Sequence, residues 1–355
     1  MRQAMKRVIA SLFFACPLIV QAEEVYEFPA RIAGDNHLRI EASGDIEVVQ
    51  PLIAEFQSQY PMVSVTYRDS LTNDLYTRLA KACEGSGPMA DIVFSSAVDH
   101  MVKLANDGCA TEQNLAERSM LQGTENFRNQ VFGFSFEPAV IVYNKALLPR
   151  QDVPRNRDQL ISLIRDNPQR FAGRIGTYDI AASGIGYLFG FFDAEQSSAF
   201  GRLIEALGRA NARLYCCTSD LLKSIETGET LIGYNLLGSY AARRMANGAP
   251  IGIILPSDYT LVLSRAALVP ARAANPQNGA LFLEFLLSQQ GQDVAGKSFF
   301  FSRDKALPAG VEGPDEEGRR GTFRPIPLSP ALILVTDREK RRHFLAQWQQ
   351  AFEGN

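Results

Sequence analysis

The stretch LRIEASGDIEVVQPLIAEFQSQY, residues 38–60, contains one complete strand-to-helix unit. Leu38, Ile40 and Ala42 alternate with polar residues, which is the pattern of a half-buried strand. Ser43-Gly44-Asp45 then opens a segment whose apolar residues keep helical spacing, and Pro61 ends that segment. A strand followed at once by an amphipathic helix predicts an α/β fold.

Small polar residues and glycine recur at six predicted junctions between a strand and the next helix. They are Ser43–Asp45, Ser70–Asp74, Ser95–Ser96, Ala182–Gly184, Thr218–Asp220 and Asn235–Ser239. Strands that alternate with helices predict a parallel sheet with right-handed crossovers. Helix N-termini at the carboxyl edge of such a sheet present unpaired N–H groups, which hold anions without any titrating catalytic group. The pattern therefore indicates a protein built to bind a ligand.

Two long extended runs, residues 132–144 and 260–270, interrupt this rhythm. We interpret each as a crossing between two parts of the chain. The predicted fold class is therefore α/β, with two α/β lobes joined by two extended hinge crossings. A ligand bound between such lobes favours the closed form through its contacts with both.

The crossings divide the chain into predicted domains. Residues 23–136 form the first lobe, to which residues 262–330 return, and residues 137–261 form the second lobe. Within the returning part, residues 307–330 are rich in Pro and Gly and are predicted to be loop. Residues 331–355 contain a final helix, which the sequence assigns to neither lobe.

Residues 1–22 have the features of a secretory signal peptide. A basic start precedes a short apolar run, and Ala22 ends a small-residue cleavage site. Export from the cytoplasm is therefore expected, with lipid attachment at Cys16 as the alternative. Without the three basic residues of this segment, 33 Lys and Arg face 39 Asp and Glu. The resulting net charge near −6 argues against nucleic acid as a partner.

Four cysteines follow the predicted signal peptide. Cys83 and Cys109 flank one predicted strand–helix unit, and an exported protein is expected to form a disulfide there. The adjacent pair Cys216-Cys217 is predicted either to form a vicinal disulfide or to remain as thiols. Their spacing matches no zinc site, so no metal and no cofactor are expected.

Several segments in order along the chain resemble one protein family. They are Ile40–Gly44, Ala90–Ser96, Ala139–Lys145, Gly233–Tyr240, Ala274–Pro276 and Phe285–Gln292. Together they resemble the class II periplasmic solute-binding proteins of ABC importers, in the branch that includes the ferric-ion-binding proteins. Within that branch the chain is most similar to the phosphoglycerate-transport regulatory proteins and related binders of phosphorylated organic anions.

The resemblance implies half of a known binding site. Ser183-Gly184 matches the turn that holds an anion beside the metal in the ferric-binding proteins. Those proteins bind iron through two adjacent tyrosines, but this chain has no Tyr-Tyr pair and carries Tyr234-Asn235 near the matching place. The departure favours a phosphorylated or carboxylated organic anion over iron.

The candidate ligand contacts lie at the strand ends and are polar or glycine. They are Ser43, Gly44, Ser95, Ser96, Tyr178, Ser183, Gly184 and Asn235. Each serine has the alternative role of a helix N-cap, and Tyr178 that of a core residue. Glu137 on the first crossing is a candidate to hydrogen-bond a ligand hydroxyl but is most simply a surface carboxylate, and Arg68 is a candidate partner for an anion.

Catalytic motifs find little support in this chain. Residues 291–298 fit the P-loop pattern GxxxxGKS, yet they follow a predicted helix instead of a strand. No serine-hydrolase elbow occurs, and the three histidines lack an evident nucleophile. We therefore predict a non-enzymatic, monomeric binding protein that serves an ABC permease or a membrane sensor kinase, with ferric-ion binding as the alternative function.

Overall fold

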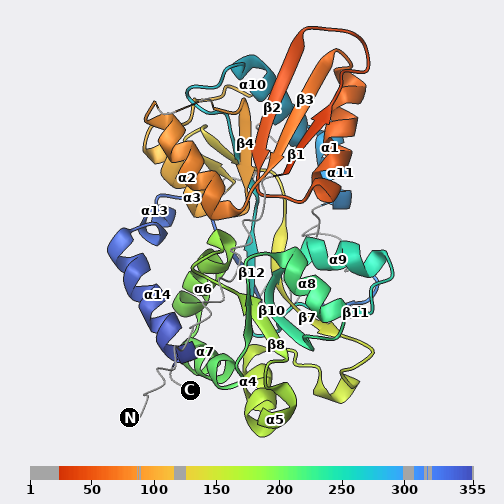
Figure 1. Ribbon diagram of the computed structural model, residues 1–355, viewed down its shortest axis with the longest axis vertical. Coiled ribbons are helices and arrows are strands. Elements are labelled where there is room, and N and C mark those ends of the chain that lie inside the picture. Colours follow the sequence, from red (N-terminus) through yellow and green to blue (C-terminus); the bar gives the residue numbers. More distant parts are fainter. Residues whose placement is uncertain are drawn as a thin grey trace, which may run out of the picture.

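The computed structural model has two lobes, one above the other in Figure 1. It describes residues 24–85, 87, 89–115, 125–298, 308–315, 318 and 322–353. The predicted signal peptide and Cys16 lie outside these residues. None of the helices in this described part combines the length and the apolarity that crossing a bilayer requires.

The first lobe is built on a seven-stranded sheet with the order β1-β3-β2-β4-β13-β6-β5. Its elements are β1 (Glu24–Phe28), β2 (Asn36–Ala42), α1 (Ile46–Gln59), β3 (Val63–Asp69), α2 (Thr72–Cys83), β4 (Ile92–Ser95), α3 (Val98–Asn106), β5 (Asn126–Phe127), β6 (Val131–Gly133), β13 (Ala266–Leu268), α10 (Pro276–Leu287) and α11 (Gln289–Ser298). Strands β3, β2 and β4 are parallel, as predicted, whereas β1 and β13 pair antiparallel.

The second lobe contains an eight-stranded sheet, whose main path is β14-β11-β7-β10-β8-β9. Its elements are β7 (Glu137–Asn144), the 3-10 helix η2 (Arg150–Asp152), α4 (Arg157–Asp166), α5 (Pro168–Phe171), β8 (Ile175–Tyr178), α6 (Gly184–Gln196), α7 (Phe200–Arg209), β9 (Arg213–Tyr215), α8 (Thr218–Glu226), β10 (Ile232–Leu237), α9 (Gly238–Ala246), β11 (Ile251–Ile254) and β12 (Thr260–Leu263). The chain enters this lobe between β6 and β7 and leaves it between β12 and β13.

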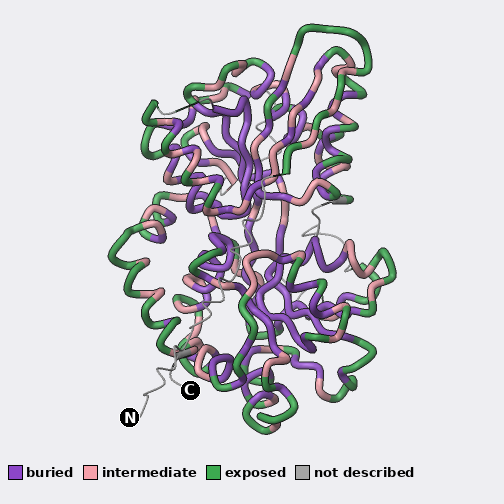
Figure 2. The backbone as a smooth tube through the Cα atoms, viewed as in Figure 1, coloured by how far each residue is buried: buried purple, intermediate pink, exposed green. Residues whose placement is uncertain are grey.

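Each lobe buries the apolar face that its sequence pattern predicts. Leu38, Ile40 and Ala42 of β2 are at most 1% exposed, whereas the polar residues that alternate with them are exposed or half-buried. Figure 2 shows the buried residues gathered in the central strands of both lobes and the exposed residues along the outer helices. The strand ends are thereby fixed in position at the junction between the lobes.

The segment after α11 differs from the prediction of a loop that stays with the first lobe. The short strands β14 (Val311–Glu312) and β15 (Phe323–Pro325) pair with β11 and β12 of the second lobe. Runs of two or three residues show no alternation, so the sequence carried no periodic signal for them.

The C-terminal segment contacts both lobes. Helix α13 (Ala331–Val335) packs on α3 of the first lobe, and α14 (Arg338–Glu353) packs on α7 of the second. The two helices follow one side of the molecule across the junction (Figure 1). Trp348 is 6% exposed and stacks on Phe352, so this helix is held by a small aromatic cluster.

Two sequence interpretations concerning motifs are resolved by the fold. Cys83 and Cys109 are joined by a disulfide with a Cα–Cα distance of 5.5 Å, which confirms the predicted pairing. Residues 291–298, which fit the P-loop pattern, are helical within α11 instead of forming a phosphate-binding loop after a strand.

Candidate functional site

A pocket of about 300 Å³ lies between the two lobes. Its walls are the N-terminal ends of α1, α2 and α8 together with parts of β10, α9 and the second crossing. The described lining residues are Glu24, Tyr26, Ser43–Glu47, Asp69–Thr72, Asp74, Ser96, Ser183, Ile185, Cys216–Asp220, Leu237, Tyr240 and Arg265. The pocket therefore takes residues from both sides of the hinge, as a ligand cleft requires.

Three helices begin at this pocket without a side-chain cap. The N-cap residues Asp45 of α1, Leu71 of α2 and Cys217 of α8 make no side-chain hydrogen bond to the first turn. The first-turn N–H groups of a helix have no partner within the helix and mark its positive end. The three N-termini thus offer hydrogen-bond donors to whatever occupies the pocket.

Carboxylates also line the pocket. Glu47, Asp74 and Asp220 occupy the first turns of α1, α2 and α8, where an acidic side chain complements the helix dipole. Burial, and then the charge of Asp45, raise the pKa of Asp69 to about 7. The pocket is therefore mixed in character, with backbone donors and carboxylate acceptors side by side.

Arg265 is the one cation among the described lining residues, and it lies on the second crossing. Its Nε atom is 2.9 Å from Oε1 of Glu137, and both side chains are 0% exposed. Its Nη1 donates to the Ser43 carbonyl oxygen over 2.8 Å. The interpretation of Glu137 as a surface carboxylate is therefore wrong, because the fold brings it against a guanidinium from 128 residues away. Burial raises the pKa of Glu137, and the charge of Arg265 opposes that effect.

The lobes contact one another directly beside the pocket. The Gly184 amide of α6 donates to Oγ1 of Thr72 in the first lobe over 2.8 Å. Asn73 donates to the carbonyl oxygens of Ala181 and Ala182. These hydrogen bonds join the two lobes, so the structure represents a closed arrangement.

A second set of interlobe contacts centres on Asp45. Its backbone amide donates to the Tyr240 hydroxyl over 3.2 Å, and Ser219 Oγ donates to its carboxylate. Burial strongly raises the pKa of Tyr240, with the charge of Asp45 acting in the same direction. The phenol therefore stays protonated and serves as a hydrogen-bonding group.

Half of the predicted contact residues line the pocket, namely Ser43, Gly44, Ser96 and Ser183. The other four lie beside it or away from it. Ser95 Oγ is 3.0 Å from Ser43 Oγ and accepts from the Ala97 amide, so it supports the wall. Tyr178 is 1% exposed, and its hydroxyl forms a hydrogen bond with the hydroxyl of Thr218. The backbone amide of Gly184 already donates to Oγ1 of Thr72.

Asn235 belongs to a buried network in the second lobe instead of the pocket. Its φ of 62° is left-handed, at a bulge in β10, and its Nδ2 donates to Asp193 over 2.5 Å. The Tyr234 hydroxyl also donates to Asp193, and Arg157 pairs with Asp193 at 2.9 Å. Arg157 and Asp193 are at most 2% exposed. The Tyr234 hydroxyl is thus hydrogen-bonded to the buried Arg157–Asp193 ion pair.

Several residues that line the pocket were not among the contacts predicted from the sequence. Asp69 and Arg265 follow no local motif, because only the tertiary fold brings them together. Ser70–Thr72 and Thr218–Asp220 did carry a signal, since both lie at predicted strand-to-helix junctions. Cys216 and Cys217 form a disulfide in the pocket wall, which settles the alternative left by their spacing.

Comparison with protein families gives a match over most of the chain. Residues 38–301 match the family described as bacterial extracellular solute-binding protein. The chain belongs to this family of solute-binding proteins. Comparison with curated protein sequences yields no match.

Solved structures place the fold among the class II periplasmic solute-binding proteins of ABC transporters. The substrate-binding protein of an ABC transporter from Agrobacterium tumefaciens is 35% identical, with a TM-score of 0.85 over 93% of this chain and 99% of that one. AfuA from Actinobacillus pleuropneumoniae, solved with fructose-6-phosphate, has a TM-score of 0.72 at 14% identity over 90% and 99%. Iron-bound HitA from Pseudomonas aeruginosa has a TM-score of 0.65 at 14% identity over 89% and 99%.

Proposed function

We propose that this protein captures a small phosphorylated or carboxylated organic anion that also carries hydroxyl or ammonium groups. The ligand occupies the pocket between the lobes, and the protein delivers it to an ABC permease. One observation carries the proposal: α1, α2 and α8 all begin at this pocket without a side-chain cap. Convergent first-turn N–H groups favour an anionic group at their focus.

The carboxylates of the pocket indicate which groups the ligand carries besides its anionic group. Asp45 and Asp69 accept hydrogen bonds, so they favour hydroxyl or ammonium donors on the ligand beside its anionic group. A bare inorganic anion would face the carboxylate of Asp45, and this like-charge contact costs free energy. A ligand of mixed character satisfies both sets of groups. The fructose-6-phosphate of AfuA is a compound of this kind in a protein of the same fold.

The setting of this capture follows from the family. We infer a periplasmic location after removal of residues 1–22, and we infer that the protein acts as a monomer. Presentation of the closed, loaded form to a membrane sensor kinase is the alternative to delivery to a permease. Both uses depend on closure, because a partner distinguishes the loaded protein by its closed shape.

Ferric-ion binding is the second candidate, and one observation favours it. Tyr240 and Asp45 bring a phenol and a carboxylate together in the pocket, and oxygen ligands suit a hard ion. However, within the described residues the acidic, histidine and cysteine side chains close enough to share an ion are Cys216, Cys217 and Asp220. That group contains soft sulfur ligands, so we rank iron below the organic anion.

A thermal-shift screen tests the proposal on the chain from residue 23 with its disulfides intact. The panel contains phosphoglycerates, phosphoenolpyruvate, hexose phosphates, aminoalkyl phosphonates, inorganic phosphate, citrate and ferric ion. A ligand at 100 times its Kd stabilises the protein by about 2.7 kcal/mol. We expect an increase in melting temperature with one or more organic anions. Stabilisation by ferric ion alone would contradict the proposal.

A matched pair of variants locates the binding. Ser183 is the N-cap of α6 and accepts from the Gly186 amide, a role that aspartate also performs. Ser183→Asp therefore keeps the cap but adds a negative charge to the pocket wall, and we expect it to abolish the anion-induced shift. Asn156→Asp makes the same kind of N-cap on α4, outside the pocket lining, and is expected to leave the shift unchanged.

A further inference from the structure

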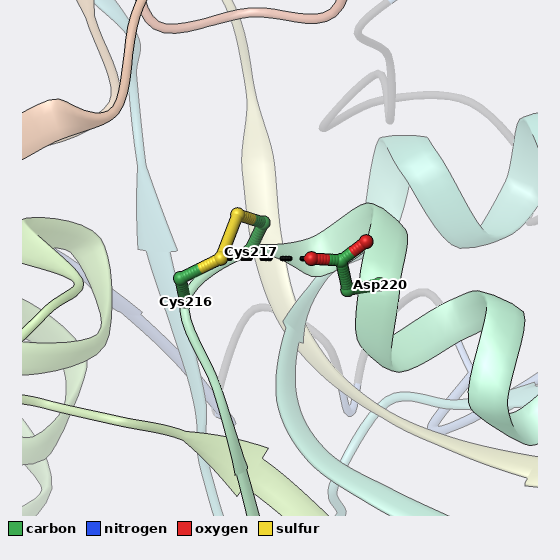
Figure 3. A group of neighbouring side chains, drawn as sticks. All are labelled: Cys216, Cys217 and Asp220. Carbon is green, nitrogen blue, oxygen red and sulfur yellow. Dashed lines mark hydrogen bonds between the residues drawn. A yellow bond between two sulfur atoms is a disulfide. The ribbon is translucent and has the colours of Figure 1, made fainter. Parts of the chain in front are cut away.

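The Cys216–Cys217 disulfide lies in the wall of the pocket, immediately before α8. Figure 3 shows the two sulfur atoms at the start of this helix, with the Asp220 carboxylate from its first turn turned towards them. Oδ2 of Asp220 is 3.6 Å from Sγ of Cys216. One ligand atom from each of the three residues lies within 4.8 Å of the others.

The two disulfides of the chain differ in position and in the loop they close. Cys83–Cys109 closes a loop of 26 residues within the first lobe, and Cys109 is 4% exposed. Cys216–Cys217 joins adjacent residues that are half-buried at the pocket, so a small reductant can approach it. A bond between neighbours also removes little freedom from the unfolded chain, and the fold therefore does not depend on it.

We propose that the reduced form of this pair, together with Asp220, is a binding site for a thiophilic divalent metal ion such as Cd²⁺ or Zn²⁺. A dithiol reductant supplies two electrons and two protons, which convert the disulfide to two thiols, and becomes a disulfide itself. On metal binding, each thiol releases its proton to the solvent, and two thiolate sulfurs and one carboxylate oxygen coordinate the ion. The disulfide therefore switches the site off when it forms.

The surroundings of the sulfur atoms suit this chemistry. Two thiolates with one carboxylate form a ligand set for zinc-like ions, and a fourth position stays open to the pocket. Helix α8 begins at Thr218, and the positive end of its dipole stabilises anionic sulfur. In a tetrahedral site with bonds of about 2.3 Å the ligand atoms are roughly 3.8 Å apart. Once the disulfide is reduced, its two sulfur atoms can separate to this spacing, and Oδ2 of Asp220 is already 3.6 Å from Sγ of Cys216.

A cadmium titration tests the site without reference to the solute. The chain from residue 23 is reduced with dithiothreitol, and the reductant is then removed under anaerobic conditions. The reduced protein is titrated with Cd²⁺ while the ultraviolet absorption of the thiolate-to-cadmium charge transfer is recorded. Alkylation followed by peptide mass analysis identifies the cysteines that were reduced. We expect Cys216 and Cys217 to be reduced before Cys83 and Cys109, and one Cd²⁺ to bind per chain.

Variants assign the ligands. Cys216→Ser/Cys217→Ser is expected to abolish the absorption band, and Asp220→Asn to weaken Cd²⁺ binding at least tenfold. Asp74→Asn is the matched control, since Asp74 has the same first-turn position on α2 in the same pocket. Equal binding by oxidised and reduced protein, a band that survives the double serine variant, or no binding after reduction would overturn the proposal. The ligand screen uses the oxidised protein, so failure of one experiment leaves the other standing.

Discussion

The guanidinium of Arg265 and the carboxylate of Glu137 form an ion pair with a 2.9 Å Nε–Oε1 distance and no exposure to solvent. Glu137 begins β7 on the first crossing, and Arg265 lies on the second crossing. The pair therefore ties the two crossings together at the wall of the interlobe pocket. Because Arg265 also donates to the carbonyl of Ser43, the same residue links the hinge to the N-terminus of α1.

Loss of one partner of this buried pair should be strongly destabilising. Arg265→Met leaves the Glu137 carboxylate buried without its counter-charge, and we expect the free energy of unfolding to fall by about 3–5 kcal/mol. Urea denaturation measures this change. Glu137→Gln/Arg265→Met should recover much of the loss. Arg202→Met removes half of an ion pair with exposed partners and is expected to cost less than about 1 kcal/mol.

The Asp69 carboxyl should make stability depend on pH. Its pKa is raised to about 7 in the folded protein, against about 3.9 in an unfolded chain. The folded state therefore binds more protons between these values, and the free energy of unfolding should fall as the pH rises from about 4 to about 7, by up to roughly 1.4 kcal/mol per unit. Denaturation across this range measures the slope.

The variant Asp69→Asn should flatten this pH dependence, because it removes the titrating group. Asp166→Asn changes an exposed residue at the end of α4 and is the matched control. A slope that is unchanged in Asp69→Asn would show that another group is responsible.

A methyl group at Gly184 should hold the lobes apart. A Cβ atom there would lie 2.9 Å from His100 Cε1 and Thr72 Oγ1 and 3.0 Å from Asn73 Oδ1, all in the first lobe. We expect Gly184→Ala to enlarge the radius of gyration in small-angle scattering and to weaken ligand binding about tenfold. Gly201→Ala, where a Cβ meets nothing within 4 Å, should change neither quantity.

The two disulfides should contribute unequally to stability. Cys83→Ser/Cys109→Ser opens a loop of 26 residues, which by the chain-entropy account costs about 3 kcal/mol. Cys216→Ser/Cys217→Ser opens a bond between neighbours and should cost less than about 1 kcal/mol. Thermal unfolding of both variants under oxidising conditions gives the comparison. Equal losses would show that the adjacent pair supports the fold as well as the pocket wall.

The sequence was informative where local periodicity determines structure. The alternation of Leu38, Ile40 and Ala42 and the Ser-Gly turn after it predicted β2 and the start of α1, because burial of one face fixes both period and position. The extended runs around Glu137 and Arg265 likewise marked the hinge crossings. Ser43 and Ser183 were predicted as contacts because they lie at strand-to-helix junctions, and both line the pocket. The carboxyl ends of parallel strands lie at one edge of a sheet, so residues that follow them are brought together.

Contacts between residues far apart in the sequence could not be predicted from local periodicity. Nothing near Arg265 in the sequence indicates that its partner is Glu137 or that it lines the pocket. Asn235 was predicted as a ligand contact because it follows a strand at a predicted strand-to-helix junction. Its backbone is instead left-handed at a bulge in β10, and its side chain donates to Asp193. Strand β14 and the antiparallel edge strand β1 depend on partners far along the chain and have no local pattern.

The most direct test of the central claim is a calorimetric titration of one compound and its uncharged analogue. The compound is the organic anion that stabilises the protein most in the screen, and the analogue has the same skeleton without the phosphate or carboxylate. We predict one site per chain for the anion and at least a hundredfold weaker binding of the analogue, a difference of about 2.7 kcal/mol. Equal affinities would show that the uncapped helix N-termini of α1, α2 and α8 do not select an anion, and would contradict the account.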